Sequence, residues 1–324
     1  MSSEIESIPA LSVVVPAPDR IDTVLRTVRA IAAQDIAAEI ELVVVARNPA
    51  DGVPAELAAA LGSVRVVPMP DWTTMTAARV RGIEQARAPI VALAEDHCFP
   101  SPGWARALVA AHRGPWAAVG PAFLNANPAS LVSWANLAIE YGPWLAPVAA
   151  GATDHVPGHN SSYKRDVLLG YGNRLEEVLE AESILHWDLR QRGSAVAMAP
   201  EATTRHENFS RLGPSFALRF GGGRLFAACR AGHWPLWRRA AFALASPAIP
   251  VVRAWRTHRH LQRVAEARGR FGLRPLVFFL LAVDAFGECV GYVFGAGDQA
   301  RRLSEIEYDR PRFLTASDRQ AIES

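Results

Sequence analysis

The chain has 324 residues, half of them hydrophobic, which is enough for a full α/β core and an appended segment. Its formal net charge of +2 is unremarkable, but arginines gather in the second half, which indicates either an anionic neighbour there or a coding bias toward arginine. The three cysteines lie far apart without a CxxC pair, which argues against a zinc knuckle and a disulfide framework.

The first strands are indicated by two continuous apolar runs, Leu11–Pro16 and Ile40–Ala46. Runs without alternation are typical of strands buried on both faces, as in a parallel sheet. Between them, apolar residues recur at helical spacing from residue 21 to residue 31, with Asp19 or Asp22 as a possible N-cap. Together these segments predict one βαβ unit.

The next elements bring polar residues to the end of a strand. Val64–Val67 predicts a third strand, Met75–Ala86 an amphipathic helix, and Ile90–Ala94 a fourth strand that stops directly at Glu95. Ligands in open α/β sheets bind at the carboxyl ends of strands. The loop after residue 94 is therefore a candidate functional site.

A helix is expected to follow this loop, with Ser101 as N-cap and Pro102 as its first residue. Residues 130–147 are aromatic at helical spacing, which favours a core helix, although this stretch could also line an acceptor site. A long helix is predicted from Leu175 to Arg192, with Gly193 as its stop, and a strand is predicted at Ala195–Ala199.

The C-terminal third is dominated by an apolar stretch over residues 273–297, which acids and glycines interrupt. Its uninterrupted part, Pro275–Val283, is too short to span a bilayer. Because Arg268, Arg270 and Arg274 precede it, we expect an interfacial helix or a re-entrant hairpin on an anionic membrane. The alternative is a helix packed on the catalytic domain.

The strand-end residues Glu95 and His97 are two ligand-type side chains separated by one residue. From a tight turn they can hold one divalent ion and leave positions open for diphosphate oxygens. Asp96 is a third candidate. Acid-rich loops after strands are often only solvated, so the context of this triplet has to decide.

An ordered series of segments resembles the family 2 glycosyltransferases with the GT-A fold, over roughly residues 10 to 210. Leu11–Pro16 resembles the family's first strand, Ala78–Gly82 its nucleotide-side motif, and Glu95–His97 falls at its Asp-x-Asp position. Gly158–Arg165 resembles the Gly-x-Asn segment, and Leu189–Gly193 resembles the helix that follows the family's base motif. The resemblance implies a Rossmann-like α/β fold with a mostly parallel sheet flanked by helices. We expect this catalytic domain at residues 1–212, followed by an arginine-rich helical region at 213–324 with a membrane-associating segment.

The resemblance also implies a metal and a donor. Glu95 and His97 would take the Asp-x-Asp positions, and His206 matches the distal histidine that often completes the metal shell. The metal would be Mn²⁺ or Mg²⁺, which bridges the donor diphosphate and neutralises charge on the leaving nucleotide. His206 could otherwise be a surface histidine. The residues expected at the nucleotide-sugar are Pro16, Arg79, Arg81 and Asp96.

The general base implied by the resemblance is Glu182, counted back from Gly193, with Glu180 in reserve. This sequence departs from the family's Glu-Asp pair because Ala181 precedes Glu182, and the acids here could also form a solvated helix face. The second strand ends in Val45-Ala-Arg-Asn48 without the family's acidic motif, so Asn48, Asp51 or backbone groups would contact the nucleotide.

The predicted function is metal-dependent, inverting transfer of a sugar, of the hexosyltransferase type, to a hydroxyl of a glycan or lipid-linked acceptor in cell-envelope polysaccharide synthesis. The alternative is a non-catalytic relative that binds nucleotide-sugar or scaffolds a glycan-assembly complex. Nucleic-acid binding is not expected, since the arginine-rich region has no zinc module or RNA-binding motif. Residues 1–9 contain acids and lack an apolar run of signal-peptide length, so we expect a cytoplasmic protein, peripheral at the cytosolic membrane face.

Overall fold

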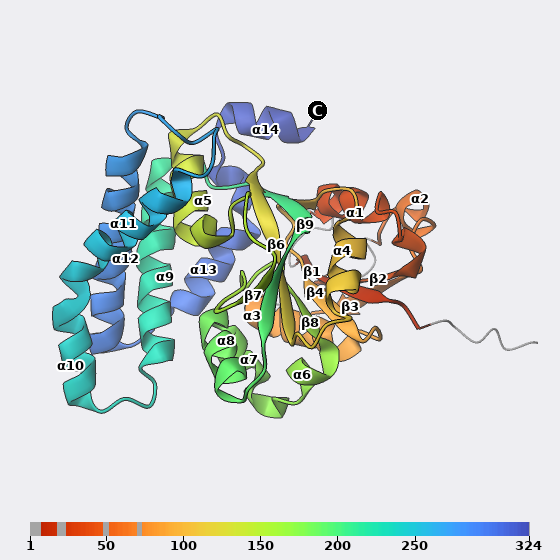
Figure 1. Ribbon diagram of the computed structural model, residues 1–324, viewed down its shortest axis with the longest axis horizontal. Coiled ribbons are helices and arrows are strands. Elements are labelled where there is room, and N and C mark those ends of the chain that lie inside the picture. The colour runs from red at the N-terminus through yellow and green to blue at the C-terminus, as the bar shows by residue number, and fades with distance from the viewer. Residues whose placement is uncertain (1–7, 18–23, 48–51, 70–72, 324) are drawn as a thin grey trace, which may run out of the picture. The chain divides into compact units, whose positions relative to one another are not determined.

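The computed structural model describes residues 8–17, 24–47, 52–69 and 73–323 (Figure 1). The chain divides into two compact units whose segments alternate along the sequence. Unit 1 consists of Met1–Pro121, Ala149–Glu176 and His186–Thr204, and unit 2 consists of Ala122–Val148, Glu177–Leu185 and Arg205–Ser324. The sequence predicts two consecutive domains instead. Residues 122–148 fall in unit 2 because the helix that they contain packs against the long apolar helix near the C-terminus.

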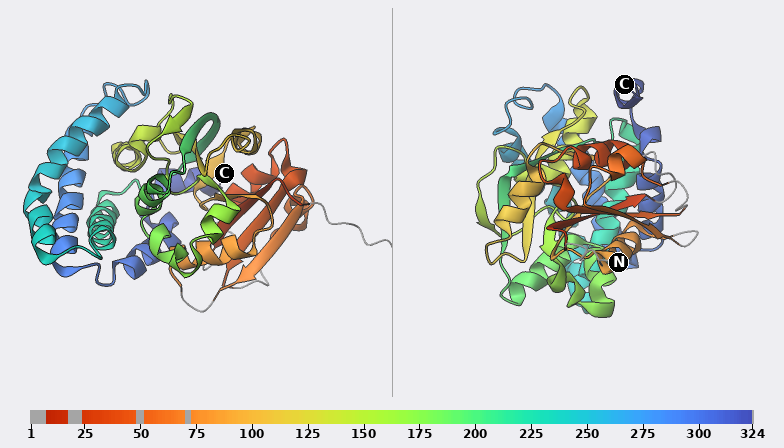
Figure 2. Two further views of the ribbon diagram at one scale, coloured as in Figure 1. Left: turned by 60° about the horizontal axis from the view of Figure 1, so that its bottom comes forward. Right: turned by 90° about the vertical axis from the view of Figure 1, so that its right-hand side faces the viewer.

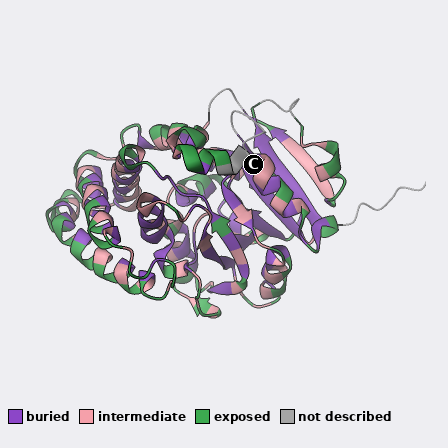
Figure 3. Cartoon of the chain, turned by 90° about the horizontal axis from the view of Figure 1, so that it is seen from above, coloured by how far each residue is buried: buried purple, intermediate pink, exposed green. Residues whose placement is uncertain are grey.

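The parallel half of the sheet consists of the four predicted strands. They are β1 (Leu11–Ala17), β2 (Ile40–Ala46), β3 (Ser63–Pro68) and β4 (Ile90–Leu93). β1 pairs in parallel with β2 and β4, and β2 pairs in parallel with β3. Every residue of β1, β2 and β4 is buried, as their mainly apolar sequences predict, including Ser12 and Glu41, which hydrogen-bond to each other. Figure 3 shows this burial across the strands.

The other half of the sheet contains antiparallel pairs, between β4 and β8, β6 and β8, and β7 and β9. Its strands are β5 (Cys98–Pro100), β6 (Ala118–Asn125), β7 (Gly151–Thr153), β8 (Ser162–Lys164) and β9 (Val196–His206). The order is β3-β2-β1-β4-β8-β6-β9-β5, with β7 on β9. The sheet is therefore mixed. Its strand β9 continues to His206 and is much longer than the predicted strand at 195–199.

The short helices are α1 (Leu25–Ala32), α2 (Ala55–Ala58), α3 (Met75–Gln85), α4 (Trp104–Ala111) and α6 (Arg165–Leu169). Three of them, α1, α3 and α4, lie near predicted positions, whereas α2 and α6 were not predicted. Thr74 caps α3 by accepting a hydrogen bond from the Ala77 N–H at 3.0 Å. The prediction of Ser101 as a cap is wrong: Gly103, at φ 80°, precedes α4 because β5 and a turn occupy the preceding residues. The caps expected at Asp19 and Asp22 lie outside the described residues.

The predicted helix over residues 175–192 is two helices, α7 (Leu175–Leu179) and α8 (Glu182–Gln191). Nothing in the local sequence explains the break between them. Gly193 has φ 78° and follows the end of α8, so the predicted glycine stop is confirmed. Short 3-10 turns lie at Ala37–Glu39, Gly142–Trp144, Gly172–Arg174, Ser246–Ala248 and Arg310–Phe313.

Unit 2 is mainly helical. Its helices are α5 (Leu131–Tyr141), α9 (Leu212–Arg230), α10 (Leu236–Ala245), α11 (Ile249–Leu261), α12 (Leu273–Phe294), α13 (Gln299–Tyr308) and α14 (Ala316–Glu323). α12 packs against α9, α10, α11 and α5, and the first three lie beside it in Figures 1 and 2. The expected aromatic core helix is α5, capped by Ser130, which accepts from the Val132 N–H at 3.1 Å.

The apolar stretch near the C-terminus forms one uninterrupted helix, α12, so the expectation of a re-entrant hairpin is wrong. Within the described residues it is the one helix that is long and apolar enough to cross a membrane, and half of its most apolar window is buried inside the protein. The acids that interrupt the stretch, Asp284 and Glu288, are buried and pair with Arg253 of α11. Arg253 offsets part of the cost of burying these acids, and burial followed by repulsion from Asp284 raises the pKa of Glu288 to about 7.

Candidate metal and donor site

The predicted site lies where β1 and β4 end. Val14 pairs with Leu93, so Pro16 and Glu95, each two residues further along, end neighbouring parallel strands at the same edge of the sheet. The buried Thr27 hydroxyl of α1 donates to the carbonyl oxygens of Glu95 and Cys98, at 3.0 and 2.9 Å. These two hydrogen bonds fix the turn that carries the Glu95–His97 triplet.

Three ligand-type side chains meet at this turn. One ligand atom each from Glu95, His97 and His206 lies within 4.8 Å of the others, and all three residues are buried. His206 reaches the group because β9, a strand of the same sheet, continues without interruption to this residue. The sequence places Glu95 and His97 side by side, but only the length of β9 adds the third group.

The His97 ring is oriented by its neighbour in sequence. Its Nδ1 lies 2.7 Å from the Asp96 Oδ1, and its Nε2 lies 3.5 Å from the Glu95 Oε2. The carboxylate acceptor favours a proton on Nδ1, which leaves the Nε2 lone pair facing the Glu95 side. A carboxylate behind an imidazole in this way is the usual support of a histidine that binds metal. Asp96, expected at the donor, therefore contacts His97.

The His206 ring is oriented in the same manner by a buried amide. Its Nδ1 lies 2.7 Å from the Asn208 Oδ1. The Asn208 amide nitrogen donates to Asn125 Oδ1 at 3.2 Å and to the His206 carbonyl at 3.0 Å, which fixes the amide oxygen toward the ring. The Tyr141 ring packs on the imidazole, with centroids 4.7 Å apart. The Asn208 contact favours a proton on Nδ1, so Nε2 is the ring nitrogen that could bind a metal.

The Glu95 carboxylate is surrounded by groups that favour its negative charge. Arg79 Nη2 lies 3.4 Å from Oε1, and the Asn160 amide donates to Oε2 at 2.7 Å. His159 Nδ1 is 3.8 Å from Oε1. Asn160 has φ 63°, a left-handed conformation that asparagine tolerates well, and its N–H donates to the Leu93 carbonyl. Hydrogen bonds and an arginine offset the cost of burying this carboxylate.

The donor set fits a divalent transition ion. Two imidazole nitrogens and one carboxylate oxygen can hold such an ion from one side and leave positions for other oxygen ligands. Carboxylate oxygens suit Mg²⁺ and Mn²⁺, and imidazole nitrogens suit transition ions. Glu95, His97 and His206 could therefore hold one divalent ion between them.

The other predicted residues are placed as follows. Arg79 is buried at the cluster, but Arg81 is exposed on α3 and lines a surface hollow with Arg65 and Glu84 beside β3, three strands from β4. The structure does not bring Arg81 to the cluster. Glu182 is half-buried and is the first residue of α8, and its role as base stays a prediction. Asn48 and Asp51 lie outside the described residues.

Two supporting residues were not assigned a role from the sequence. Asn160 holds Glu95, and Asn208 holds His206. Asn160 lies in the Gly158–Arg165 segment that the sequence analysis identified, and Asn208 is two residues after the predicted His206. The role of Asn160 could not be predicted from its own segment, because its partner Glu95 lies 65 residues away in the sequence.

Comparison with known proteins gives a family and a fold. The family model that matches is described as Glycosyl transferase family 2 and covers residues 12–171. A comparison with curated proteins gives no match. A solved structure of similar fold is the mannosyltransferase PcManGT from Pyrobaculum calidifontis in complex with GDP-Man and Mn²⁺, with 18% identity, a TM-score of 0.56, and coverage of 90% of this chain and 88% of that one.

Two further structures are more distant. GalNAc-T7 with UDP, GalNAc and Mn²⁺ shares 14% identity at a TM-score of 0.47, over 61% of this chain. This chain spans only 43% of the length of that chain. A mycobacterial protein shares 20% identity at a TM-score of 0.39, over 64% of this chain and 71% of that one.

Proposed function

Since the chain belongs, through residues 12–171, to glycosyl transferase family 2, we propose that it moves a hexose from a nucleotide-sugar donor to a hydroxyl of a glycan or lipid-linked acceptor, with inversion. The observation that carries this proposal is the buried group of Glu95, His97 and His206 at the carboxyl end of β4. The structure of PcManGT, a protein of similar fold, is described as holding GDP-Man and Mn²⁺, which supports a nucleotide-sugar and a metal here. Synthesis of cell-envelope polysaccharide is the setting that we propose for this reaction.

In the proposed reaction, Nε2 of His97 and of His206 and one Glu95 oxygen would hold the metal. Asp96 and Asn208 would keep the two rings in the binding orientation. A divalent ion bound there supplies charge neutralisation at the leaving diphosphate. Arg79 holds Glu95 in place and adds positive charge beside the same phosphates. Pro16, at the end of β1, lies at the sheet edge where the donor would bind.

We assign the general base to Glu182. A base that accepts the proton of an acceptor hydroxyl has to be ionised before the reaction. Glu182 is in the first turn of α8, where the positive end of the helix dipole favours a carboxylate. The charge state that this position favours is the one that the reaction requires.

We also propose that the protein is peripheral at the cytosolic face of an anionic membrane. Trp237, Leu244 and Val251 follow one another at intervals of seven residues and are 73%, 83% and 61% exposed. Residues 235–283 contain nine arginines and a single acid, Glu266. Arg253 pairs with Asp284 and Glu288. Exposed apolar residues beside the other arginines are typical of segments that lie on anionic lipid.

The metal assignment is tested by isothermal titration calorimetry, in which Mn²⁺ and Mg²⁺ are titrated into the wild type, His97→Ala and His206→Ala. We expect Mn²⁺ to bind the wild type more tightly than Mg²⁺ and each variant to lose most of that affinity. Thermal stabilisation by UDP-, GDP- and dTDP-sugars with Mn²⁺ then identifies the donor. A wild type that binds neither Mn²⁺ nor any of these donors would end the enzyme proposal.

The base assignment is tested separately with Glu182→Gln, and Glu176→Gln serves as a control because that exposed acid lies on the preceding helix, α7. We expect Glu182→Gln to bind Mn²⁺ and donor normally and to release nucleotide from the active donor at least about 100-fold more slowly, in the range typical of general bases. Full turnover by Glu182→Gln would assign the base to another residue and leave the family unaffected.

A further inference from the structure

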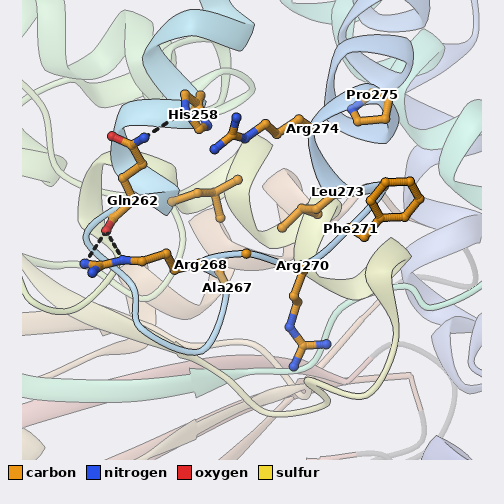
Figure 4. Close-up of a pocket in the computed structure, with 12 residues that line it drawn as sticks. His258, Gln262, Ala267, Arg268, Arg270, Phe271, Leu273, Arg274 and Pro275 are labelled. Carbon is orange, nitrogen blue, oxygen red and sulfur yellow. Dashed lines mark hydrogen bonds between the residues drawn. The ribbon is translucent and has the colours of Figure 1, made fainter.

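The connection between α11 and α12, residues 262–272, forms an elbow beside a cavity of about 760 Å³ (Figure 4). Guanidinium groups of Arg268, Arg270 and Arg274 line it, together with His258. Leu261 and Leu273 are buried and form part of its apolar lining. The cavity therefore combines several positive charges with an apolar surface.

Two arginines of this elbow, Arg268 and Arg270, are held in place by backbone carbonyls, which do not neutralise their charge. Arg268 donates twice to the Gln262 carbonyl, at 3.1 and 2.8 Å, and Arg270 donates to the Glu266 carbonyl at 2.8 Å. The twelve described residues that line the cavity include no carboxylate. The pKa of His258 is lowered, first by partial burial and then by the nearby Arg274. These guanidinium groups form a fork-like donor set that suits phosphate oxygens.

The N-terminus of α12 adds to the positive potential at the same place. α12 has 22 residues and begins at Leu273, directly after the elbow, and within the described residues no side chain caps its first turn. Backbone N–H groups at the start of a long helix attract anions. The helix start alone would not define a site, but here it adjoins three arginines.

An aromatic side chain stands out beside these charges. Phe271 is 98% exposed, and the glycines on either side of its short turn, Gly269 and Gly272, have φ of 80° and 83°. Only glycine adopts this conformation easily, so the two glycines set the turns around Phe271, which is itself one of the residues that line the cavity in Figure 4. Phe278 and Phe279, in the first turns of α12, are also about half exposed.

We propose that this elbow is the membrane contact of the protein, in which Arg268, Arg270 and Arg274 bind the phosphate of an anionic phospholipid headgroup and Phe271 enters the acyl layer. This inference rests on the proposed membrane association and is independent of the sugar transfer. The excess of arginine over residues 235–283 supplies the charge complementarity. An exposed phenylalanine between basic side chains gives the apolar half of the contact.

The test uses the full chain and co-sedimentation with vesicles of phosphatidylcholine, with and without phosphatidylglycerol. We expect binding to the anionic vesicles only, and a loss on the order of 100-fold in Arg268→Gln/Arg270→Gln/Arg274→Gln, since each arginine near a membrane contributes several-fold. The matched control is Arg301→Gln/Arg302→Gln/Arg312→Gln, which removes the same charge from exposed arginines paired with acids. Phe271→Ser should weaken binding, and Phe271→Leu should restore it.

Several outcomes would overturn the proposal. Equal losses in both triple variants would mean that net charge, and not this elbow, drives binding. Inorganic phosphate that raises the thermal midpoint of the wild type, without any preference for anionic vesicles, would make the cavity a site for soluble phosphate. A change in sedimentation coefficient on Phe271→Ser without vesicle binding would make the elbow a contact between copies. Mn²⁺ and donor affinities, measured on the same variants, report separately on the proposed function.

Discussion

Substitution of Gly287 by alanine tests how α9 and α12 are packed. The two helices touch through their backbones: a Cβ at Gly287 would lie 2.1 Å from the Phe220 carbonyl oxygen and 3.0 Å from the Arg224 nitrogen. Both are backbone atoms of α9, so they cannot move aside as a flexible side chain could. Gly222, on α9, is the matched control because a Cβ there would meet nothing within 4 Å.

The magnitude follows from two opposing effects. Alanine in a helix interior is about 0.5–1 kcal/mol more favourable than glycine, so Gly222→Ala should stabilise the protein by that amount. At Gly287 the same gain is opposed by overpacking, which costs about 1–3 kcal/mol in ordinary cores and more where backbone blocks the new atom. We expect Gly287→Ala to be destabilised by about 2 kcal/mol, and to lie about 3 kcal/mol below Gly222→Ala.

The measurement is urea unfolding of the wild type and both variants, followed by circular dichroism and extrapolated to water. Gly291→Ala, whose Cβ would lie 2.3 Å from the Arg224 carbonyl oxygen, should behave like Gly287→Ala. Equal stability of Gly287→Ala and Gly222→Ala would refute the close backbone contact between α9 and α12.

Two further predictions concern the candidate site and the pH response. Asp96→Ala should weaken Mn²⁺ binding about 10- to 100-fold, because it removes the acceptor that orients His97; titration calorimetry measures this, with the exposed Asp35→Ala as control, and unchanged affinity would contradict the assigned role of Asp96. Burial, followed by repulsion from Lys164, lowers the pKa of His112 to about 4. A lowered pKa means that the neutral imidazole contributes stability above its unfolded value near 6.5, and that this contribution is lost as the pH falls toward 4. Unfolding free energy measured from pH 7 to pH 4 should therefore fall by about 3 kcal/mol from this group, and His112→Gln should flatten the decline; an equally steep decline in the variant would assign it to other groups.

Several features of the protein are determined locally and could be predicted from the sequence. The apolar runs at Leu11–Ala17 and Ile40–Ala46 are long enough that few structures other than buried strands can accommodate them. The periodicity of α3 and the end of β4 before Glu95 depend on neighbouring residues, so they were predicted to within a residue or two. Because strand ends collect ligand-type residues, the place of Glu95 and His97 at a sheet edge was also predictable.

Other features were decided only by tertiary contacts. β9 pairs within the sheet and extends to His206. This extension places the third ligand-type residue close to Glu95 and His97. The composition of α12 is typical of a membrane-associating helix, yet half of its most apolar window is buried inside the protein. Gly287 and Gly291 allow α12 to approach the backbone of α9.

The sequence by itself therefore determined the parallel half of the sheet and the turn that carries Glu95, Asp96 and His97, because hydrophobic periodicity and strand ends are set by neighbouring residues. The tertiary structure decided which distant groups support that turn. Asn160 acquires its role only because the fold brings it to Glu95, 65 residues away in sequence. Asn208 is a near neighbour of His206 in sequence, but the fold brings it to Asn125, which accepts a hydrogen bond from its amide.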